Sequence, residues 1–309
     1  MSNTPLNLDI VAEGLGFPEG PIAMADGSVV LVEIRRQTLS RCWTGKTEVI
    51  ATLGGGPNGA AIGPDGAVYV CNNGGSVWIE RGGIGFPVGI APDYSGGRIE
   101  RVDLATGKVD RLYDRCGDHP LRAPNDLVFD RAGGLWFTDF GHDLGRQRDK
   151  SGIYHCAADG SRITEVYFGS LGYNGIGLSP DDKTVYAAET LTGRLIAFDV
   201  TGPGQIARPR GGRFPGRIVA TMPGNPPEYF DSLAVTAAGN ICVATLIAPG
   251  ITTITPDGHH TKLDTPDPFT TNICFGGADL RDAWITLSGT GKLARTRWPE
   301  PGLRLAFNA

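Results

Sequence analysis

Six stretches of this sequence follow one plan, and this repetition limits the folds open to the chain more than any other feature. Each stretch has an acid or amide as its second residue, an alternating apolar run after it, a Gly-, Asp- or Asn-rich turn and a second apolar run. Alternation with period two marks strands, and such turns mark hairpins. The six stretches begin at Pro18 (PEGPIAMADGSVVLVEI), Pro57 (PNGAAIGPDGAVYVCNN), Pro124 (PNDLVFDRAGGLWFTDF), Tyr173 (YNGIGLSPDDKTVYAAET), Phe230 (FDSLAVTAAGNICVATL) and Thr271 (TNICFGGADLRDAWITLS).

The spacing of these repeats predicts the architecture. Their acids and amides, called the key residues below, recur every 39 to 67 positions as Glu19, Asn58, Asn125, Asn174, Asp231 and Asn272. A period of ~40–50 residues with about four strands per unit is typical of a β-propeller. We therefore predict an all-β, six-bladed β-propeller that occupies residues 1–309 as a single domain. Ring closure should pair the early segment LNLDIVAEG with the late segment KLARTRWP, because a shared blade leaves no open edge.

The key residues also predict a site. Equivalent positions of different blades are related by rotation about the central channel, so six side chains at the start of the innermost strands would converge on it. Carboxylate and amide oxygens gathered at one point suit Ca²⁺, Mg²⁺ or Mn²⁺, and Zn²⁺ or Fe²⁺ less well. The alternative is that Asn and Asp only shape the turn before each strand. That alternative explains a repeated Asn but not Glu19, whose longer side chain is a poor turn former.

One gap between repeats is wider than the others and contains the segment GGIGFPVGIAPDYSGG. We interpret residues 80–97 as an insertion on one face of the ring, either a lid loop over the site or an ordinary exposed connector. Phe86 and Tyr94 in this insertion are candidates for contact with a substrate.

Composition excludes several partners. The net charge is −5 and Lys and Arg form no run, which argues against nucleic acid. No apolar stretch is long enough to span a bilayer. The start, MSNTPLNLDI, lacks the pattern of a secretory signal, and the six cysteines form no CxxC pair. We expect a cytoplasmic protein with reduced, mostly buried thiols that binds neither membrane nor nucleic acid, in an oligomeric state that the sequence leaves unassigned.

The motifs around the key residues resemble those of the SMP-30/gluconolactonase/LRE family of six-bladed propellers. LGFPEGP, APNDL, YNGIGLSPDDKTVYAAET, FDSLAV and TNICFGGADLRDAWIT appear in the family's order and cover essentially the whole chain. The resemblance implies one divalent metal ion held by Glu19, Asn174 and Asp231, with Asn125 as fourth ligand or substrate contact. It also implies hydrolysis of a lactone, typically of a sugar acid.

Several further residues are candidates for the substrate. Some relatives place a sugar-contacting arginine two residues before the Asn125 position, where this chain has Ala123, so Arg122 is the nearest basic side chain. His119 lies just before this motif and is a candidate for the pocket rim. Asn58 and Asn272 share the predicted face and could bond substrate or water, although turn chemistry explains them as well.

The residues permit more than one function. A metal ion with open positions polarises a carbonyl and lowers the pKa of bound water. Asp231 is then the candidate catalytic base, or only a ligand that orients the water. The leading hypothesis is a lactonase that opens a small lactone, a sugar-acid lactone above all, to its hydroxy acid. The alternatives are hydrolysis of an organophosphate or other ester at the same metal, and a calcium-binding scaffold without turnover.

Overall fold

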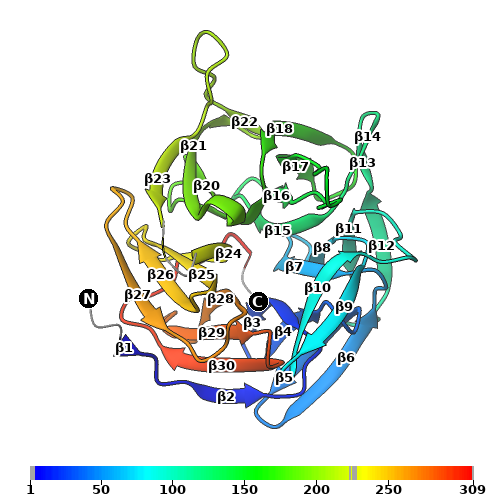
Figure 1. The fold of residues 1–309 in the computed structure, drawn as a ribbon, viewed down its shortest axis with the longest axis vertical. Helices are drawn as coiled ribbons and strands as arrows, with labels where there is room; N and C mark the ends of the chain where they lie inside the picture. The colour runs from blue at the N-terminus through cyan, green and yellow to red at the C-terminus, as the bar shows by residue number, and fades with distance from the viewer. Residues whose placement is uncertain (1–3, 223, 225–227, 308–309) are drawn as a thin grey trace.

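Six sheets are arranged around a central axis in the computed structural model, which describes residues 4–222, 224 and 228–307 (Figure 1). Each sheet is a blade of antiparallel strands in which the first strand of the repeat lies innermost, and among the described strands β1 alone adds in parallel, at the edge of one blade. Neighbouring innermost strands contact one another in order around the ring, and the last contacts the first. The predicted all-β, six-bladed β-propeller is therefore confirmed.

The first three blades each contain four strands. Blade 1 consists of β3 (Pro18–Ala23), β4 (Val29–Glu33), β5 (Thr38–Trp43) and β6 (Lys46–Thr52). Blade 2 consists of β7 (Pro57–Ile62), β8 (Val68–Asn72), β11 (Arg98–Val102) and β12 (Val109–Tyr113). Blade 3 consists of β15 (Pro124–Phe129), β16 (Gly134–Asp139), β17 (Ser151–Ala157) and β18 (Ile163–Ser170).

The other three blades follow the same order with small additions. Blade 4 consists of β19 (Tyr173–Leu178), β20 (Thr184–Glu189), β21 (Arg194–Gly202) and β23 (Arg217–Thr221), with β22 (Gln205–Ile206) and the 3₁₀ turn η1 (Thr190–Thr192). Blade 5 consists of β24 (Glu228–Val235), β25 (Ile241–Ile247), β26 (Gly250–Ile254), β27 (His260–Asp264) and β1 (Thr4–Pro5). Blade 6 consists of β28 (Thr270–Gly276), β29 (Asp282–Leu287), β30 (Lys292–Arg297) and β2 (Asp9–Ala12).

The ring closes through β2, a strand close to the N-terminus. β2 is the outermost strand of blade 6 and runs antiparallel to β30, with Asp9 opposite Arg295 and Ile10 opposite Ala294. These are the two segments that the sequence predicts to pair. The edge of the last blade is thereby covered by chain from the opposite end of the sequence.

The core consists of apolar clusters between neighbouring blades. Trp136 of β16 packs with residues of blade 4, and Trp284 of β29 packs with Val29 and Leu31 of blade 1. Both tryptophans are buried, as expected for packing between blades. All six cysteines are free thiols, and four of them are buried. Across the described ranges, no helix has the length and apolar character needed to cross a membrane.

The insertion after β8 differs from the predicted loop. Ser76–Arg81 (β9) and Ile84–Ile90 (β10) form a two-stranded hairpin, so the insertion begins earlier than residue 80 and most of it is regular. Gly82 and Gly83 have φ values of 60° and 79°, the left-handed conformation that a tight two-residue hairpin turn requires. The hairpin lies toward the viewer in Figure 1, over one face of the ring. Whether it acts as a lid stays a prediction.

Candidate metal and active site

Each innermost strand is irregular close to its key residue. Its pairing with the second strand of the blade shifts register at or directly beside the key residue: between Glu19 and Ile22, Pro57 and Ala60, Pro124 and Leu127, Tyr173 and Ile176, Phe230 and Leu233, and Thr270 and Asn272. A β-bulge re-aims the side chain that it carries. In β7, β15, β19 and β24 the bulge contains the key residue itself, whereas the bulge of β3 follows Glu19 and that of β28 precedes Asn272.

Small residues after the key residues allow the innermost strands to crowd together. A Cβ atom on Gly20 would lie 2.6 Å from the backbone nitrogen of Ala60, and one on Gly175 would lie 2.7 Å from the carbonyl oxygen of Asp231. Neighbouring strands thus approach through glycine, which has no side chain to keep them apart. This close approach brings the key residues of separate blades within reach of one another.

Glu19 is the most deeply buried key residue, with 1% of its surface exposed. Its Oε2 accepts hydrogen bonds from the backbone N–H of Gly20 at 2.7 Å and from Nδ2 of Asn272 at 2.8 Å. Burial raises the pKa of Glu19 to about 7, although these two hydrogen bonds act in the opposite direction. The carboxylate is therefore held in place but poorly solvated.

Asp231 carries the second buried carboxylate of the predicted metal set. Burial raises its pKa well above the usual range, and the negative charge of Glu19 raises it further. A hydrogen bond with the Asn174 side chain partly offsets this increase. Because each acid disfavours ionisation of the other, a cation between them would stabilise both charged forms.

The amide oxygens distinguish a cation site from turn chemistry. Oδ1 of Asn272 accepts a hydrogen bond from the N–H of Ile273 at 2.8 Å, so this oxygen caps its own backbone. In contrast, Oδ1 of Asn125 and Oδ1 of Asn174 are buried and have no hydrogen-bond partner among the residues that the structure describes. Buried polar atoms are normally satisfied, and a bound ion is one way to satisfy these two. Turn chemistry accounts for Asn272 but not for Asn125 or Asn174.

A third acid, Asp126, was not among the candidates drawn from the sequence. It occupies the slot after a key residue where three other blades have Gly. Its Oδ1 accepts the N–H of Leu127 at 2.9 Å. Burial and the charge of Glu19 raise the pKa of Asp126 to about 7. The available signal was its position in the repeat, next to Asn125.

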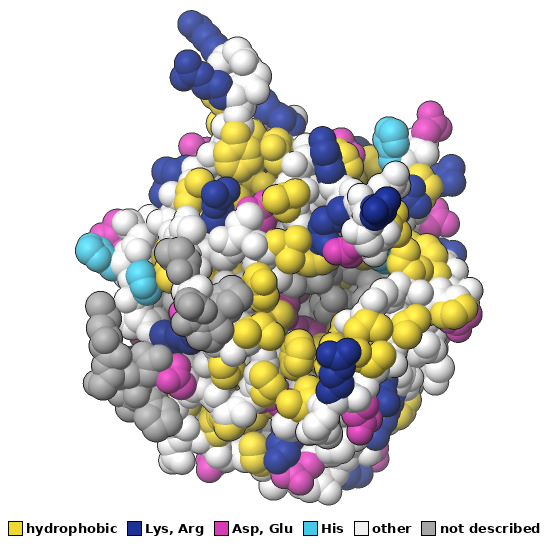
Figure 2. All heavy atoms as spheres, in the orientation of Figure 1, with side chains coloured by type: hydrophobic (Ala, Val, Ile, Leu, Met, Phe, Trp, Pro, Cys, Tyr) yellow, Lys and Arg dark blue, Asp and Glu magenta, His cyan; other side chains and the backbone are white. Residues whose placement is uncertain are grey.

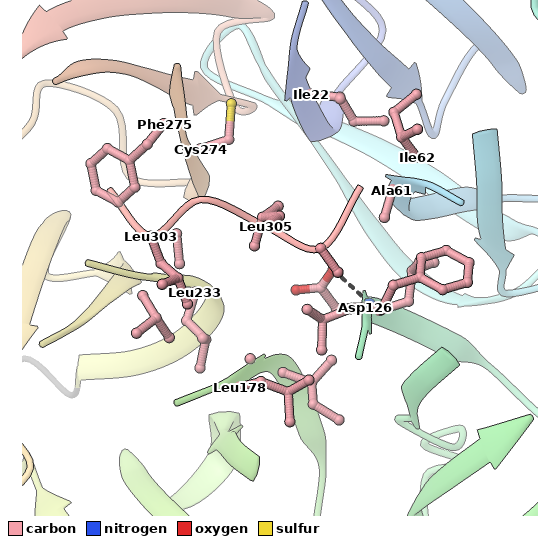
Figure 3. Close-up of a pocket in the computed structure, with 18 of the residues that line it drawn as sticks. Ile22, Ala61, Ile62, Asp126, Leu178, Leu233, Cys274, Phe275, Leu303 and Leu305 are labelled. Carbon is pink, nitrogen blue, oxygen red and sulfur yellow. Dashed lines mark hydrogen bonds between the residues drawn. The ribbon is translucent and has the colours of Figure 1, made fainter. Parts of the chain in front are cut away.

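Asp126 also lines a cavity of about 120 Å³ with apolar walls (Figure 3). The walls come from the later residues of the innermost strands, among them Ile22, Leu178 and Leu233. The C-terminal segment 303–307 crosses this end of the channel. Four key residues, Glu19, Asn58, Asn125 and Asn174, are instead the second residues of their strands. We infer that a substrate enters from that face, which carries the β9–β10 hairpin.

The donor set fits a hard divalent cation. Within the described part of the chain, no three His, Cys, Asp or Glu side chains surround one point closely enough to hold an ion. A cation would therefore need amide as well as carboxylate oxygens, and Glu19, Asp231, Asn174 and Asn125 offer both. All-oxygen ligation suits Ca²⁺, Mg²⁺ or Mn²⁺ better than Zn²⁺.

The other residues that the sequence suggests for substrate binding do not all lie at the candidate metal site. Asn58 is half-buried at the equivalent position of β7. His119 is exposed on β14 (His119–Pro120), which pairs with β13 (Arg115–Cys116) at the outer edge of the ring (Figure 1). The side chain of Arg122 is exposed, and its backbone N–H donates to Asp139 at 2.7 Å.

Tyr94 and Phe86 both belong to the insertion after β8, but their side chains make different contacts. The hydroxyl of Tyr94 donates to the carbonyl of Arg122 at 2.6 Å and accepts from the N–H of Gly97 at 3.1 Å, so it anchors the end of the insertion. Its ring meets that of His142 edge-on at 5.1 Å. The half-buried ring of Phe86 stacks on Phe269 at 5.7 Å.

The fold and the site together define a class of protein, a six-bladed propeller with a candidate cation centre. The centre is marked by buried carboxylates and by amide oxygens without a partner among the described residues. Residues 17–289 match the family described as SMP-30/Gluconolactonase/LRE-like region. The chain belongs to this family, as its motifs predict.

Individual relatives are distant. A gluconolactonase from Zymomonas mobilis subsp. mobilis is 23% identical over 210 residues, which are 61% of this chain and 52% of that protein, so the chain spans about half of its length. The solved structure of a gluconolactonase from Xanthomonas campestris has a TM-score of 0.74 and 20% identity, covering 97% of this chain and 96% of that chain. A calcium-binding protein, regucalcin, from Agrobacterium tumefaciens also has a TM-score of 0.74 and 20% identity, with 99% and 100% covered. At such identities the two structures show the shared fold.

Proposed function

We propose that this chain hydrolyses a small lactone to its hydroxy acid in a reaction that depends on a divalent cation. The observation that carries the proposal is the pair of amide oxygens of Asn125 and Asn174, which are buried and have no hydrogen-bond partner in the described part of the chain. Their innermost strands belong to the same ring as those that carry the buried carboxylates of Glu19 and Asp231. Family membership supports the same conclusion, since the family description names gluconolactonase and a similar solved structure is described as one.

Glu19, Asn174 and Asp231 would hold the cation, with Asn125 as fourth ligand or substrate contact. When bound, such an ion supplies a Lewis acid that polarises a carbonyl and makes water more acidic. Two amide ligands are neutral, so only two negative charges oppose the ion among these four side chains. Much of its Lewis acidity is then retained, which favours catalysis over a purely structural role.

The residues of the chain would contribute position and proton transfer. Water adds to the lactone carbonyl carbon, the ring C–O bond breaks, and the leaving oxygen takes up a proton. Asp231 would accept the proton of the attacking water if that water lies within hydrogen-bond reach, and otherwise would orient it. Asn272 keeps Glu19 in place through its 2.8 Å hydrogen bond, and Asn58 would hydrogen-bond substrate or water.

The proposal extends to the kind of lactone that the chain hydrolyses. The gluconolactonase relatives favour a sugar-acid ring. Ala123 stands where some relatives have a sugar-contacting arginine, so one polar contact to such a ring is absent from the sequence of this chain. A panel must therefore include sugar-acid lactones and less polar lactones.

The test begins with metal analysis of protein purified without chelators, followed by removal of metal and re-addition of Ca²⁺, Mg²⁺, Mn²⁺ or Zn²⁺ before assays on the lactone panel and a phosphotriester. We expect lactone hydrolysis that EDTA abolishes and one cation restores. Asp231→Ala should remove hydrolysis while circular dichroism still reports a folded β protein. Turnover of the phosphotriester alone, or ion binding without turnover, would replace the proposal by one of the alternative functions. Parental activity of Asp231→Ala would refute the assigned site.

A further inference from the structure

An aromatic rim of four rings borders the entrance to the channel: Phe17, Trp78, Phe86 and Phe269. Phe17 contacts Trp78 of the hairpin at 5.1 Å and Phe269 at 6.0 Å, and Phe86 stacks on Phe269 at 5.7 Å. The rim thus joins the β9–β10 hairpin to blades 1 and 6 through a continuous aromatic contact.

The rim lies directly beside the key residues. Phe17 precedes Glu19 by two residues, and Phe269 precedes Asn272 by three. Both rings therefore stand where the innermost strands β3 and β28 begin. Phe17 is buried beneath the others, whereas Trp78, Phe86 and Phe269 are partly exposed. Hydrophobic side chains border much of the central hollow on the face shown in Figure 2.

Other loops on this face extend the apolar surface. Val88 of the hairpin is 48% exposed and Ile247 at the end of β25 is 43% exposed. Leu144 and Leu171 are exposed in the loops that follow β16 and β18. Single exposed apolar side chains are ordinary, whereas the rings of the aromatic rim contact one another, and such a contiguous group marks a binding surface.

Two polar contacts near the rim already engage side chains of the insertion. Arg35 pairs with Glu80 of the hairpin at 3.5 Å. The Tyr94 hydroxyl bonds to the backbone of Arg122 and Gly97. A polyhydroxylated ring needs polar partners along its edge, whereas an alkyl or aryl group needs only the carbon surface that the rim presents.

We propose that the lactone preferred by this site carries an apolar alkyl or aryl substituent, which lies on the aromatic rim while the ring ester reaches Glu19 and Asp231. This inference rests on the proposed lactone hydrolysis and narrows its substrate. Burial of each methylene contributes roughly a fourfold gain in binding. A six-carbon chain that is only partly covered should then raise kcat/KM by about tenfold or more over the unsubstituted ring.

The substrate is a better occupant than a second protein because the rim continues into the site through Phe17 and Phe269. A second copy of the chain remains an outcome that the experiment must separate. Phe86 is the residue to change, since its ring is partly exposed on a surface hairpin. Phe86→Ser removes the apolar contact, and Phe86→Leu keeps it. Val49, 57% exposed on the outer strand β6, provides Val49→Ser as a matched control away from the entrance.

The experiment compares kcat/KM for γ-butyrolactone, its γ-hexyl derivative and galactono-γ-lactone, with the protein re-metallated. We expect the γ-hexyl compound to exceed both others by about tenfold or more. Phe86→Ser should lower the ratio of γ-hexyl to unsubstituted substrate by about tenfold, Phe86→Leu by less than about threefold, and Val49→Ser not at all.

Each contrary result has a separate meaning. Hydrolysis of none of the three lactones by the parent protein would refute the proposed function itself. Hydrolysis without preference for the γ-hexyl compound, or a ratio that Phe86→Ser leaves unchanged, would refute this inference alone. Sedimentation that shows Phe86→Ser converting a dimer to a monomer with an unchanged ratio would make the rim a self-association surface and would also refute it.

Discussion

The Asn272 side chain donates a hydrogen bond to Glu19 across 253 positions of sequence, at the seam where the last blade meets the first. The donor Nδ2 lies 2.8 Å from Oε2, and both side chains are buried. The same contact thus joins the two ends of the ring and orients the first acid of the candidate metal set. Closure of the propeller and geometry of the site are linked at this point.

Asn272→Ala should therefore weaken both the fold and the site. Loss of one donor to a buried carboxylate costs about 1–3 kcal/mol, which a denaturant titration would measure. Calorimetry should show weaker binding of the activating cation, because Glu19 loses its orienting partner. Asn240→Ala is the matched control, since Nδ2 of Asn240 donates to Glu300 at 2.9 Å away from the hub. A similar loss of cation affinity in both variants would contradict the link.

The metal-free protein should lose stability as pH rises. A glutamate ordinarily ionises near pH 4.5, whereas burial raises the pKa of Glu19 to about 7. Between these values the folded protein keeps a proton that the unfolded chain has released, so folding is favoured less as pH increases and the change ends above pH 7. For one group the total is roughly 3 kcal/mol.

Thermal unfolding of chelator-treated protein between pH 4.5 and 8 would measure this effect. The midpoint should fall over the window from 4.5 to 7, and a saturating cation should restore it most at the high end. Glu19→Gln should flatten the profile, because it removes one titrating group and its charge from beside Asp231. A midpoint of the metal-free parent that rises steadily from pH 5 to 7 would show that these acids are not destabilised by burial.

The sequence predicts a shared hub because its signal is periodic. Glu19, Asn174 and Asp231 share one slot of a repeated plan, and rotation in a propeller brings equivalent slots to the axis. The repeat pattern does not reveal which amide oxygens have a hydrogen-bond partner in the folded protein. That Asn272 caps its own backbone whereas Asn174 does not depends on bulge geometry, which residue types alone do not determine.

The positions of His119 and of the insertion depend on the path of the backbone, which residue types alone do not determine. His119 is close to Asn125 in sequence, but the β13–β14 pair carries it to the outer edge of the ring. The Gly- and Pro-rich composition of the insertion predicts a loop. Its Gly82-Gly83 pair was nevertheless a hairpin signal, and β9 and β10 pair on either side of it.

Asp126→Asn tests whether the third buried acid destabilises the empty hub. The charge of Glu19 raises the pKa of Asp126, and the charge of Asp126 in turn raises that of Asp231. A neutral isostere removes this repulsion and still accepts the N–H of Leu127. We expect metal-free Asp126→Asn to be more stable than the parent at pH 8 by about 1 kcal/mol or more. A lower unfolding midpoint than the parent at that pH would show that the Asp126 carboxylate is needed in its charged form.

Gly175→Ala tests the close approach of blades 4 and 5. Its new Cβ would lie 2.7 Å from backbone atoms of Asp231 and Leu233, which are fixed in β24 and cannot yield as a flexible side chain can. We expect a loss of about 1–3 kcal/mol in the free energy of unfolding and weaker cation binding, because the strand that carries Asp231 is displaced. Gly202→Ala is the control, since its nearest neighbour is the Gln205 side chain at 3.7 Å, an ordinary contact. Urea titration and calorimetry of the two variants measure both quantities, and equal behaviour of the pair would show that the spacing of the innermost strands does not depend on glycine at this slot.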